Sequence, residues 1–292
     1  MAVRAAGLNF VDALFVQGRY QIRPSVPFVP GSELAGVITE VGSQVEGLEV
    51  GGRVLASVGL GAFAEEVVLE GSAVTPIPHG VTDGQAATLG QSYCTAVFAL
   101  ERRACVQPGR HVLVLGAGGG VGLAAIDVAC ALGATVIGAA SSETKRRLAL
   151  DAGATSVIDT SSESLKDRAR ELSGGGVDVA VDPVGGDLSE AALRSLGYEG
   201  QLLVIGFASG TIASLPANQI LLRNRRVVGI DWGAWALGHP TENAALLSVV
   251  LDRVAAGAYH PIEPTTYPLA DAGVALRDLL ERRISGKAVL VP

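Results

Sequence analysis

The feature that most constrains this chain is a glycine run between an apolar stretch and a helical pattern. The run is Gly116-Ala117-Gly118-Gly119-Gly120-Val121-Gly122. Residues 111–115 before it are apolar, as in a strand buried on both faces, and apolar residues recur after it at helical spacing as far as Leu132. Strand, glycine turn and helix in this order bring a pyrophosphate against the amides at a helix N-terminus. The sequence therefore predicts a dinucleotide-binding unit.

The glycine pattern by itself is a weak signal. It is Ala117-x-Gly119-x-x-Gly122, with alanine in the place of the first glycine. A flexible surface loop is the alternative interpretation, but the flanking strand and helix are the context that the motif requires. We therefore expect the cofactor diphosphate to contact Ala117, Gly118, Gly119, Gly120, Val121 and Gly122.

The chain of 292 residues exceeds the usual size of one domain, so two domains are expected. The first part is β-rich, with glycines and prolines that mark turns between the strands, and it shows no alternation of strands and helices. Its strand-like runs are residues 34–41, 53–58 and 63–69. A helical segment over residues 86–100 then leads into the glycine run.

Alternating strands and helices follow the glycine run. The strand-like runs are residues 135–139, 177–181, 201–205 and 226–230, and Ser164 is a candidate N-cap for one of the helices between them. This alternation predicts a parallel sheet covered on both faces. Helices over 243–256 and 271–283 and a last strand over 288–291 complete the chain. We expect the tail to return to the first domain, which gives residues 1–92 plus 262–292 as one domain and 93–261 as the other.

Composition excludes several classes of protein. No apolar run reaches the roughly 18 residues of a membrane span, and no basic and apolar leader opens the chain, so a cytoplasmic protein is expected. The net charge of -7 argues against a nucleic-acid partner. Three cysteines and four histidines lie scattered along the chain without the spacing of a zinc site or a disulfide framework.

The end of the second strand of the dinucleotide unit indicates which cofactor is bound. An acidic residue about 20 residues past the glycines binds the ribose hydroxyl of NAD, whereas small and basic residues admit a 2′-phosphate. Here the strand ends in Ser141-Ser142, followed by Lys145 and Arg146. These residues favour NADPH, with NADH as an open alternative. An ordinary exposed helix lysine is the alternative interpretation of Lys145.

Five motifs in order resemble a known family. They are Ala6-Gly7-Leu8-Asn9-Phe10-Val11-Asp12, Val29-Pro30-Gly31-Ser32-Glu33, the glycine run, Asp182-Pro183-Val184-Gly185-Gly186 and Gly286-Lys287. Together they resemble the zinc-independent quinone oxidoreductase branch of the medium-chain dehydrogenase/reductase superfamily, the group that includes zeta-crystallin. The resemblance covers nearly the whole chain. It implies an α/β protein with a Rossmann-type doubly wound parallel sheet and a GroES-like, β-rich substrate domain.

The chain departs from the family in several places. Where zinc-dependent relatives carry metal ligands, this sequence has Asn9, Ser32 and Ala87, so the resemblance implies chemistry without a metal. Relatives often have a tyrosine in the place of Leu14 and a tyrosine or histidine in the place of Thr160. They also carry further residues before the Ala6–Asp12 segment. Either the start of the sequence is misassigned, or the substrate domain folds without its first strands and with an exposed edge.

The resemblance places Asn9 and Asp12 beside the nicotinamide and the substrate, with Tyr20 nearby. An amide can donate to a carbonyl oxygen that gains charge, and a phenol or an ordered water can supply a proton. Each residue has a structural alternative. Asn9 is also typical of a turn, Asp12 of a helix-start cap and Tyr20 of packing at a rim.

The resemblance also assigns cofactor contacts. Ser141 and Lys145 would hold the 2′-phosphate, and the residues near the nicotinamide would be Thr95, Gly206, Phe207, Ile230 and Trp232. Trp232 and Trp235, with Tyr20 and Tyr93, are candidates for the walls of a flat acceptor site, and packing at a subunit interface is the alternative for the tryptophans.

The predicted function is NADPH-dependent hydride transfer to a quinone or another α,β-unsaturated carbonyl. An enoyl-thioester reductase shares the chemistry, and a crystallin-like cofactor-binding protein with little turnover is the alternative from another class. An RNA-binding role is disfavoured by the acidic balance. The edge strand near residues 226–230 would pair across a two-fold axis to form a homodimer.

Overall fold

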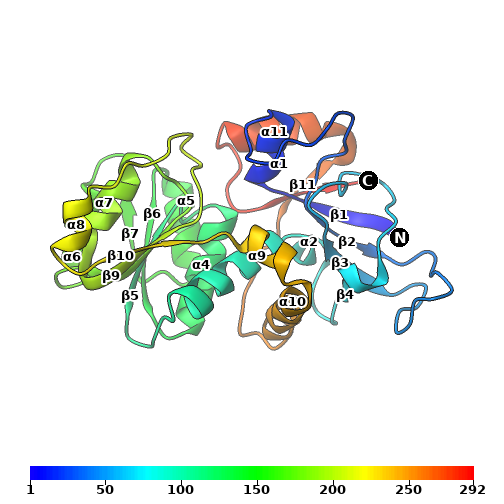
Figure 1. Ribbon diagram of the computed structural model, residues 1–292, viewed down its shortest axis with the longest axis horizontal. Helices are drawn as coiled ribbons and strands as arrows, with labels where there is room; N and C mark the ends of the chain where they lie inside the picture. Colours follow the sequence, from blue (N-terminus) through cyan, green and yellow to red (C-terminus); the bar gives the residue numbers. More distant parts are fainter. The chain divides into compact units, whose positions relative to one another are not determined.

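The computed structural model describes residues 1–292, which divide into two compact units. Unit 1 comprises Met1–Cys94 and His239–Pro292, and unit 2 comprises Thr95–Gly238. The expected limits differ mainly in the helix α10, Pro240–Ala255, which groups with unit 1 because it packs against the segment Gly90–Cys94 and the strand Val74–Pro76. Each unit contains one six-stranded sheet (Figure 1).

The sheet of unit 1 has the strand order β11-β12-β1-β2-β3-β4. The strands are β1 (Ala2–Leu8), β2 (Glu33–Val37), β3 (Arg53–Ser57), β4 (Val74–Pro76), β11 (Thr265–Pro268) and β12 (Ala288–Val291). All neighbours are antiparallel except β11 and β12, and Ala6 is paired with Leu290. The C-terminal strand therefore lies beside the first strand of the chain.

The core of unit 1 lies between this sheet and its covering segments. Leu8, Leu34 and Leu290 are almost completely buried there, together with Ala275 of α11. The helical elements of the unit are α1 (Phe10–Val16), η1 (Gly71–Ala73), α2 (Asp83–Ala86), η2 (Gly90–Cys94), α10 (Pro240–Ala255), η4 (Leu269–Asp271) and α11 (Ala272–Leu280).

One expectation for the first part of the chain is wrong, and another is confirmed only in part. Residues 63–69 form no regular strand, because their pairing with β1 is limited to one bridge, Ala2 to Glu66, and to backbone bonds such as that from Val3 N to Glu65 O. The expected helix over 86–100 is interrupted. After α2 the chain continues as η2, α3 (Thr95–Val97) and η3 (Phe98–Arg103), with π-helical turns in η2 and η3.

The sheet of unit 2 has the order β10-β9-β8-β5-β6-β7, and every neighbouring pair is parallel. Its strands are β5 (His111–Leu115), β6 (Thr135–Ala140), β7 (Ser156–Asp159), β8 (Val177–Asp182), β9 (Leu196–Val204) and β10 (Arg226–Gly229). From β5 the chain proceeds to β6 and β7 in one direction, then crosses back to β8 and proceeds to β9 and β10 in the other. This doubly wound order confirms the expected Rossmann-type sheet and puts its switch point between β5 and β8.

Helices alternate with these strands as the sequence predicts. They are α4 (Gly120–Ala131), α5 (Glu143–Asp151), α6 (Leu165–Leu172), α7 (Asp187–Ser195), α8 (Ala217–Leu221) and α9 (Trp232–Gly238). The helices α4 and α5 contact each other, and so do α6 and α7. Because parallel crossovers are right-handed, these two pairs cover opposite faces of the sheet. Ser164 caps α6, as expected, by accepting from Asp167 N.

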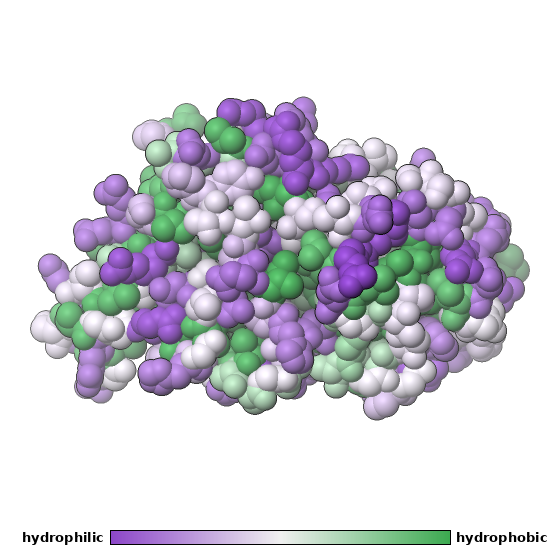
Figure 2. Space-filling view, turned by 180° about the vertical axis from the view of Figure 1, so that it is seen from behind, coloured by the Kyte–Doolittle hydropathy of each residue, from purple (hydrophilic) through white to green (hydrophobic).

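The core of unit 2 lies on both faces of its sheet, where side chains of the central strands are buried. Leu113, Leu115, Ile137 and Leu202 are fully buried. On the face of the molecule in Figure 2, hydrophobic residues form several separate patches among polar ones. No helix is both long and apolar enough to cross a membrane.

Candidate active site

The glycine run forms a tight turn between β5 and α4. Gly116 adopts φ +59, a conformation that favours glycine, whereas Ala117 does not adopt a positive φ. The Ala117 amide donates to Ala139 O at 3.1 Å, and Ala117 is completely buried beneath the loop. Alanine is tolerated in the first motif position because the residue before it makes the turn.

Two further glycines are fixed by close approach. A Cβ at Gly122 would lie 2.2 Å from Gly116 O, and a Cβ at Gly118 would lie 2.4 Å from Lys145 Cβ. Gly119 is different, because its only neighbour within reach is Gly116 O at 3.4 Å. The partly exposed side of the loop is thus open at Gly119, where no protein side chain fills the space.

Gly119 is also the N-cap residue of α4, and no side chain caps this helix. The first amides of a helix lack intrahelical partners and carry the positive end of the helix dipole. An open glycine in front of such amides has the shape and charge that a diphosphate needs. The residues present therefore fit a dinucleotide cofactor.

Lys145 lies beside this loop. It belongs to the first turn of α5, where Ser142 is the N-cap residue and accepts from Lys145 N at 3.4 Å. The closeness of its Cβ and Cγ to Gly118 shows that its aliphatic stem covers the loop. Ser141 is exposed at the end of β6.

Arg146 has a different set of contacts. Its guanidinium forms an ion pair with Asp159 at 3.0 Å and donates to Ala140 O at 3.3 Å. Hydrogen bonds from Ser161 and the nearby Arg146 lower the pKa of Asp159 below its usual value. The carboxylate of Asp159 therefore engages Arg146.

The residues expected near the nicotinamide lie in unit 2 but on separate elements. Thr95 is buried at the start of α3, and Gly206 and Phe207 follow β9. Ile230 and Trp232 are both 5% exposed, at the end of β10 and the start of α9. Ile230 N donates to Val204 O at 2.9 Å.

Trp235 packs within unit 2. Its ring centroid lies 5.0 Å from that of Phe98, and the Arg102 guanidinium lies 4.4 Å from the Trp235 ring centroid. These contacts with η3 hold α9 in place.

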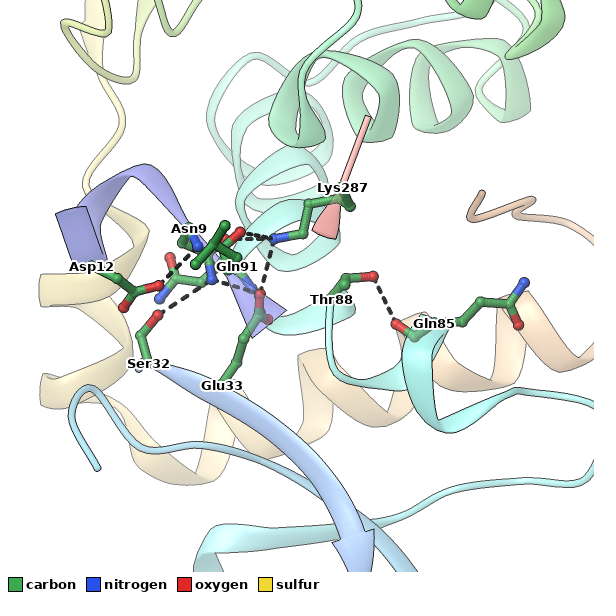
Figure 3. A network of polar contacts seen from close by, with 9 residues as sticks. Asn9, Asp12, Ser32, Glu33, Gln85, Thr88, Gln91 and Lys287 are labelled. Atoms are coloured by element: carbon green, nitrogen blue, oxygen red, sulfur yellow. Dashed lines mark hydrogen bonds and ion pairs between the residues drawn. The ribbon is translucent and has the colours of Figure 1, made fainter. Parts of the chain in front are cut away.

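A second polar site is buried in unit 1 (Figure 3). Asn9, between β1 and α1, donates from Nδ2 to Glu33 Oε1 at 2.7 Å and to Ser32 Oγ at 3.3 Å. Its Oδ1 accepts from Lys287 Nζ at 2.6 Å. Both amide hydrogens and the amide oxygen of Asn9 are thus used by protein groups. Asn9 can donate to a substrate oxygen only by releasing Ser32 or Glu33.

Glu33 and Lys287 are the charged centre of this cluster. The ammonium of Lys287 lies 3.1 Å from Glu33 Oε1 and also donates to Leu8 O, and Gln91 N donates to Glu33 Oε2 at 2.9 Å. The Glu33 and Lys287 side chains are 2% and 9% exposed. Both residues belong to motifs that carry the family resemblance, but the sequence pattern assigns no role to either of them. Ala87 is the third residue that stands where zinc-dependent relatives carry a metal ligand, and it has no polar side chain. The segment that follows Ala87 contacts the cluster through the main-chain amide of Gln91.

Asp12 is completely buried at the edge of this cluster. Its Oδ2 accepts from Asn9 N at 2.8 Å, as in a helix-start cap, and its buried Oδ1 has no hydrogen-bond partner. The pKa of Asp12 is raised to about 7, mainly by burial and in part by Glu33, against the lowering effects of the Asn9 amide, Ser32 and Lys287. Asp12 can therefore hold a proton near neutral pH.

Tyr20 does not join the cluster through any of these contacts. Its ring packs edge-on against Phe15 of α1, with the centroids 4.9 Å apart, and it is half-buried. Tyr93 packs in a tilted arrangement against the buried Tyr259 at 5.5 Å. No group of three or more His, Cys, Asp and Glu residues in the chain is placed to hold a metal ion.

Two family models match the chain. The alcohol dehydrogenase GroES-like domain matches residues 1–79, and the zinc-binding dehydrogenase model matches residues 120–250. Quinone oxidoreductase-like protein 2 from Bos taurus is 43% identical over 290 residues, covering 99% of this chain and 83% of that protein. A mycocerosic acid synthase-like polyketide synthase from Mycobacterium tuberculosis is 34% identical over 295 residues, which is 14% of its length.

Solved structures agree with these matches. The quinone oxidoreductase of Thermus thermophilus, solved also as its complex with NADPH, has 34% identity and a TM-score of 0.87, covering 100% of this chain and 90% of that one. The Escherichia coli quinone oxidoreductase complexed with NADPH has 30% identity, the same TM-score and the same coverage. A probable oxidoreductase from Mycobacterium abscessus has 36% identity and a TM-score of 0.88, covering 100% of this chain and 88% of that one. The chain therefore belongs to the quinone oxidoreductase branch of the medium-chain dehydrogenase/reductase superfamily.

Proposed function

We propose that this protein is an NADPH-dependent oxidoreductase that transfers hydride to a quinone or another α,β-unsaturated carbonyl without zinc. The observation that carries the proposal is the open face at Gly119 in front of the uncapped start of α4, with Lys145 against the same loop. The names of the bovine, Thermus and Escherichia relatives support the substrate class. The proposed setting is the cytoplasm, with a small-molecule substrate and no nucleic-acid partner.

When bound, NADPH supplies the hydride from C4 of its reduced nicotinamide. In the proposed arrangement the Gly119–Gly122 amides receive the diphosphate, and Ser141 and Lys145 hold the 2′-phosphate. Thr95, Gly206, Phe207, Ile230 and Trp232 are the proposed nicotinamide-side contacts. Their task is to position the ring and to exclude water.

On the substrate side the proposed residues are Asn9, Asp12 and Tyr20. Asp12 keeps a proton near neutral pH because its carboxyl group is completely buried. Asn9 is held by Lys287 and Glu33, so its contribution is the fixed orientation of the segment between β1 and α1. Amide, hydroxyl and ammonium groups here replace the thiolates and imidazoles that catalytic zinc requires, which supports chemistry without the metal.

The proposal is tested with purified protein and a panel of acceptors. NADPH oxidation is measured with 1,4-benzoquinone, with a simple enone and with crotonyl-CoA, before and after dialysis against a strong chelator. We expect turnover with the quinone or the enone that the chelator leaves unchanged, and lower turnover with NADH. Reduction of crotonyl-CoA without reduction of the quinone or the enone would instead identify an enoyl-thioester reductase.

The enoyl-thioester alternative has one observation in its favour, the 34% identity to the polyketide synthase over almost the whole chain. The other alternative, a cofactor-binding protein with little turnover, predicts tight NADPH binding with none of the acceptors reduced. A titration of the protein with NADPH, together with these turnover assays, therefore separates all three functions.

We also propose a homodimer formed through the β10 edge of the unit 2 sheet. Val227 of β10 is 38% exposed, and Leu221 and Leu222, at the end of the helix before this strand, are 75% and 71% exposed. Unpaired strand edges with apolar neighbours favour pairing with a second chain. Light scattering of the protein and of Val227→Asp tests this, and a monomer in both cases would reject it.

A further inference from the structure

Asp182, the last residue of β8, has a completely buried carboxylate with three donors. Its Oδ1 accepts from Val184 N at 2.8 Å and from Gly185 N at 2.9 Å, and its Oδ2 accepts from the Ser189 hydroxyl. Ser189 belongs to the first turn of α7, where the helix dipole favours negative charge. The carboxylate thus ties the end of β8, the loop after it and the start of the next helix together.

The loop after β8 is also hydrogen-bonded to the loop after β9. Pro183 O and Val184 O accept from Ala208 N at 3.1 Å and Ser209 N at 2.8 Å. The main-chain oxygen of Asp182 accepts from Ile205 N at 2.9 Å and Gly206 N at 3.3 Å. Asp182 therefore fixes the loop after β8 and, through it, the loop after β9 that contains Gly206 and Phe207.

This loop also lies against the glycine run. A Cβ on Gly116 would be 3.1 Å from Val184 Cγ2 and 3.6 Å from Pro183 Cγ. The strands β5 and β8 flank the switch point of the sheet, and ligands of such sheets bind beyond the carboxyl ends of the strands at that point. The Asp182 loop and the glycine run are thus the two sides of the predicted binding region in unit 2.

We propose that Asp182 is a positioning residue for the nicotinamide half of the cofactor, an inference that rests on the proposed dinucleotide-binding function. The glycine run and Lys145 serve the diphosphate and the 2′-phosphate. Asp182 acts on the opposite side of the switch point, through the backbone of Val184, Gly185 and Gly206. Weakening its bonds moves the nicotinamide-side loops and leaves the adenosine-side contacts in place.

The experiment compares two ligands by titration calorimetry, NADPH and 2′,5′-ADP, the second of which lacks the nicotinamide half. In Asp182→Asn a neutral amide oxygen replaces the carboxylate, so the two main-chain bonds weaken and the Ser189 bond must reverse its direction. We expect the NADPH Kd to rise about tenfold, within the range for hydrogen bonds to a charged group, and the 2′,5′-ADP Kd to stay within about twofold. Asp182→Ala, which removes all three bonds, increases the NADPH effect further if the variant folds.

Asp178→Asn is the matched control, because Asp178 lies at the other end of the same strand. Its carboxylate accepts from His111 N and Arg110, away from the glycine run. Both Kd values should stay at the wild-type level in this variant. An unchanged NADPH Kd in Asp182→Asn, or equal weakening of both ligands, overturns the inference. Failure of the wild-type protein to bind NADPH rejects the proposed function instead.

Discussion

The Lys287 ammonium lies 2.6 Å from the side-chain oxygen of Asn9, although 278 positions separate the two residues in the sequence. The contact forms because β12, which follows Lys287, pairs with β1, which precedes Asn9. The same ammonium neutralises the buried Glu33, which accepts from the Asn9 amide nitrogen. One cation therefore fixes both the charge balance of the cluster and the direction in which the Asn9 amide points.

Replacing Lys287 with methionine should destabilise unit 1 strongly. The change leaves Glu33 buried without its cation, which costs about 3–5 kcal/mol in comparable buried pairs. We expect denaturant unfolding to show this loss, and Lys287→Arg to restore part of it because arginine keeps the charge. Lys166→Met is the control, since the Lys166–Asp167 pair is exposed and should change the unfolding free energy by about 1 kcal/mol at most. Similar effects of Lys287→Met and Lys166→Met would contradict a central role for Lys287.

Asp12 should make the stability of the protein depend on pH in the opposite sense to a paired carboxylate. Its pKa is raised from 3.8 to about 7 by burial, so the folded state holds a proton that the unfolded state has lost. The contribution of this group to stability is therefore full below about pH 4, falls as the pH rises through about 7, and is constant above that.

Asp12→Asn removes this titration and keeps an oxygen that can accept from Asn9 N. We expect the melting temperature of the variant to increase relative to that of the wild type as the pH rises from 4 to 7. Above pH 7 the difference between the two melting temperatures should stay constant. Parallel melting temperatures across that range would show that Asp12 is ionised throughout.

The two glycines of the cofactor loop should respond differently to alanine. In Gly122→Ala the new Cβ meets Gly116 O at 2.2 Å, so the backbone must move, with a loss of about 1–3 kcal/mol in stability. In Gly119→Ala the methyl group finds open space and the fold should remain intact. The methyl then occupies the proposed diphosphate position, so NADPH binding is lost while thermal unfolding is unchanged. Normal NADPH binding by Gly119→Ala would remove the diphosphate site from this loop.

Lys145→Met should change the choice of cofactor without changing the fold. Methionine keeps an aliphatic stem over Gly118 and removes the charge proposed to meet the 2′-phosphate. We expect the Kd for NADPH to rise about tenfold, as for the loss of a charge-assisted bond, and the Kd for NADH to stay constant. Arg147→Met is the control on the same helix, because Arg147 is 75% exposed and pairs with Asp151. A parallel rise for both cofactors would argue against recognition of the 2′-phosphate by Lys145.

The sequence by itself determined the parts of this protein that depend on local pattern. The apolar run, the glycines and the helical spacing after residue 111 specify strand, turn and helix within about 20 residues, and the alternation that follows specifies a parallel sheet. The same information misassigned residues 63–69, where an apolar pattern lacks the continuous partner that a strand needs. It predicted the helical segment over residues 86–100 but not its π-helical turns.

Only the tertiary structure decided how polar groups from distant segments meet. No local pattern shows that Lys287 reaches Asn9, that the Gln91 amide donates to Glu33, or that the Asp182 carboxylate accepts from two amides and the Ser189 hydroxyl. These contacts follow from strand pairing and loop closure over long stretches of chain. Buried polar groups must find partners wherever the fold brings them, so their identity is set by the packed structure and not by neighbours in the sequence.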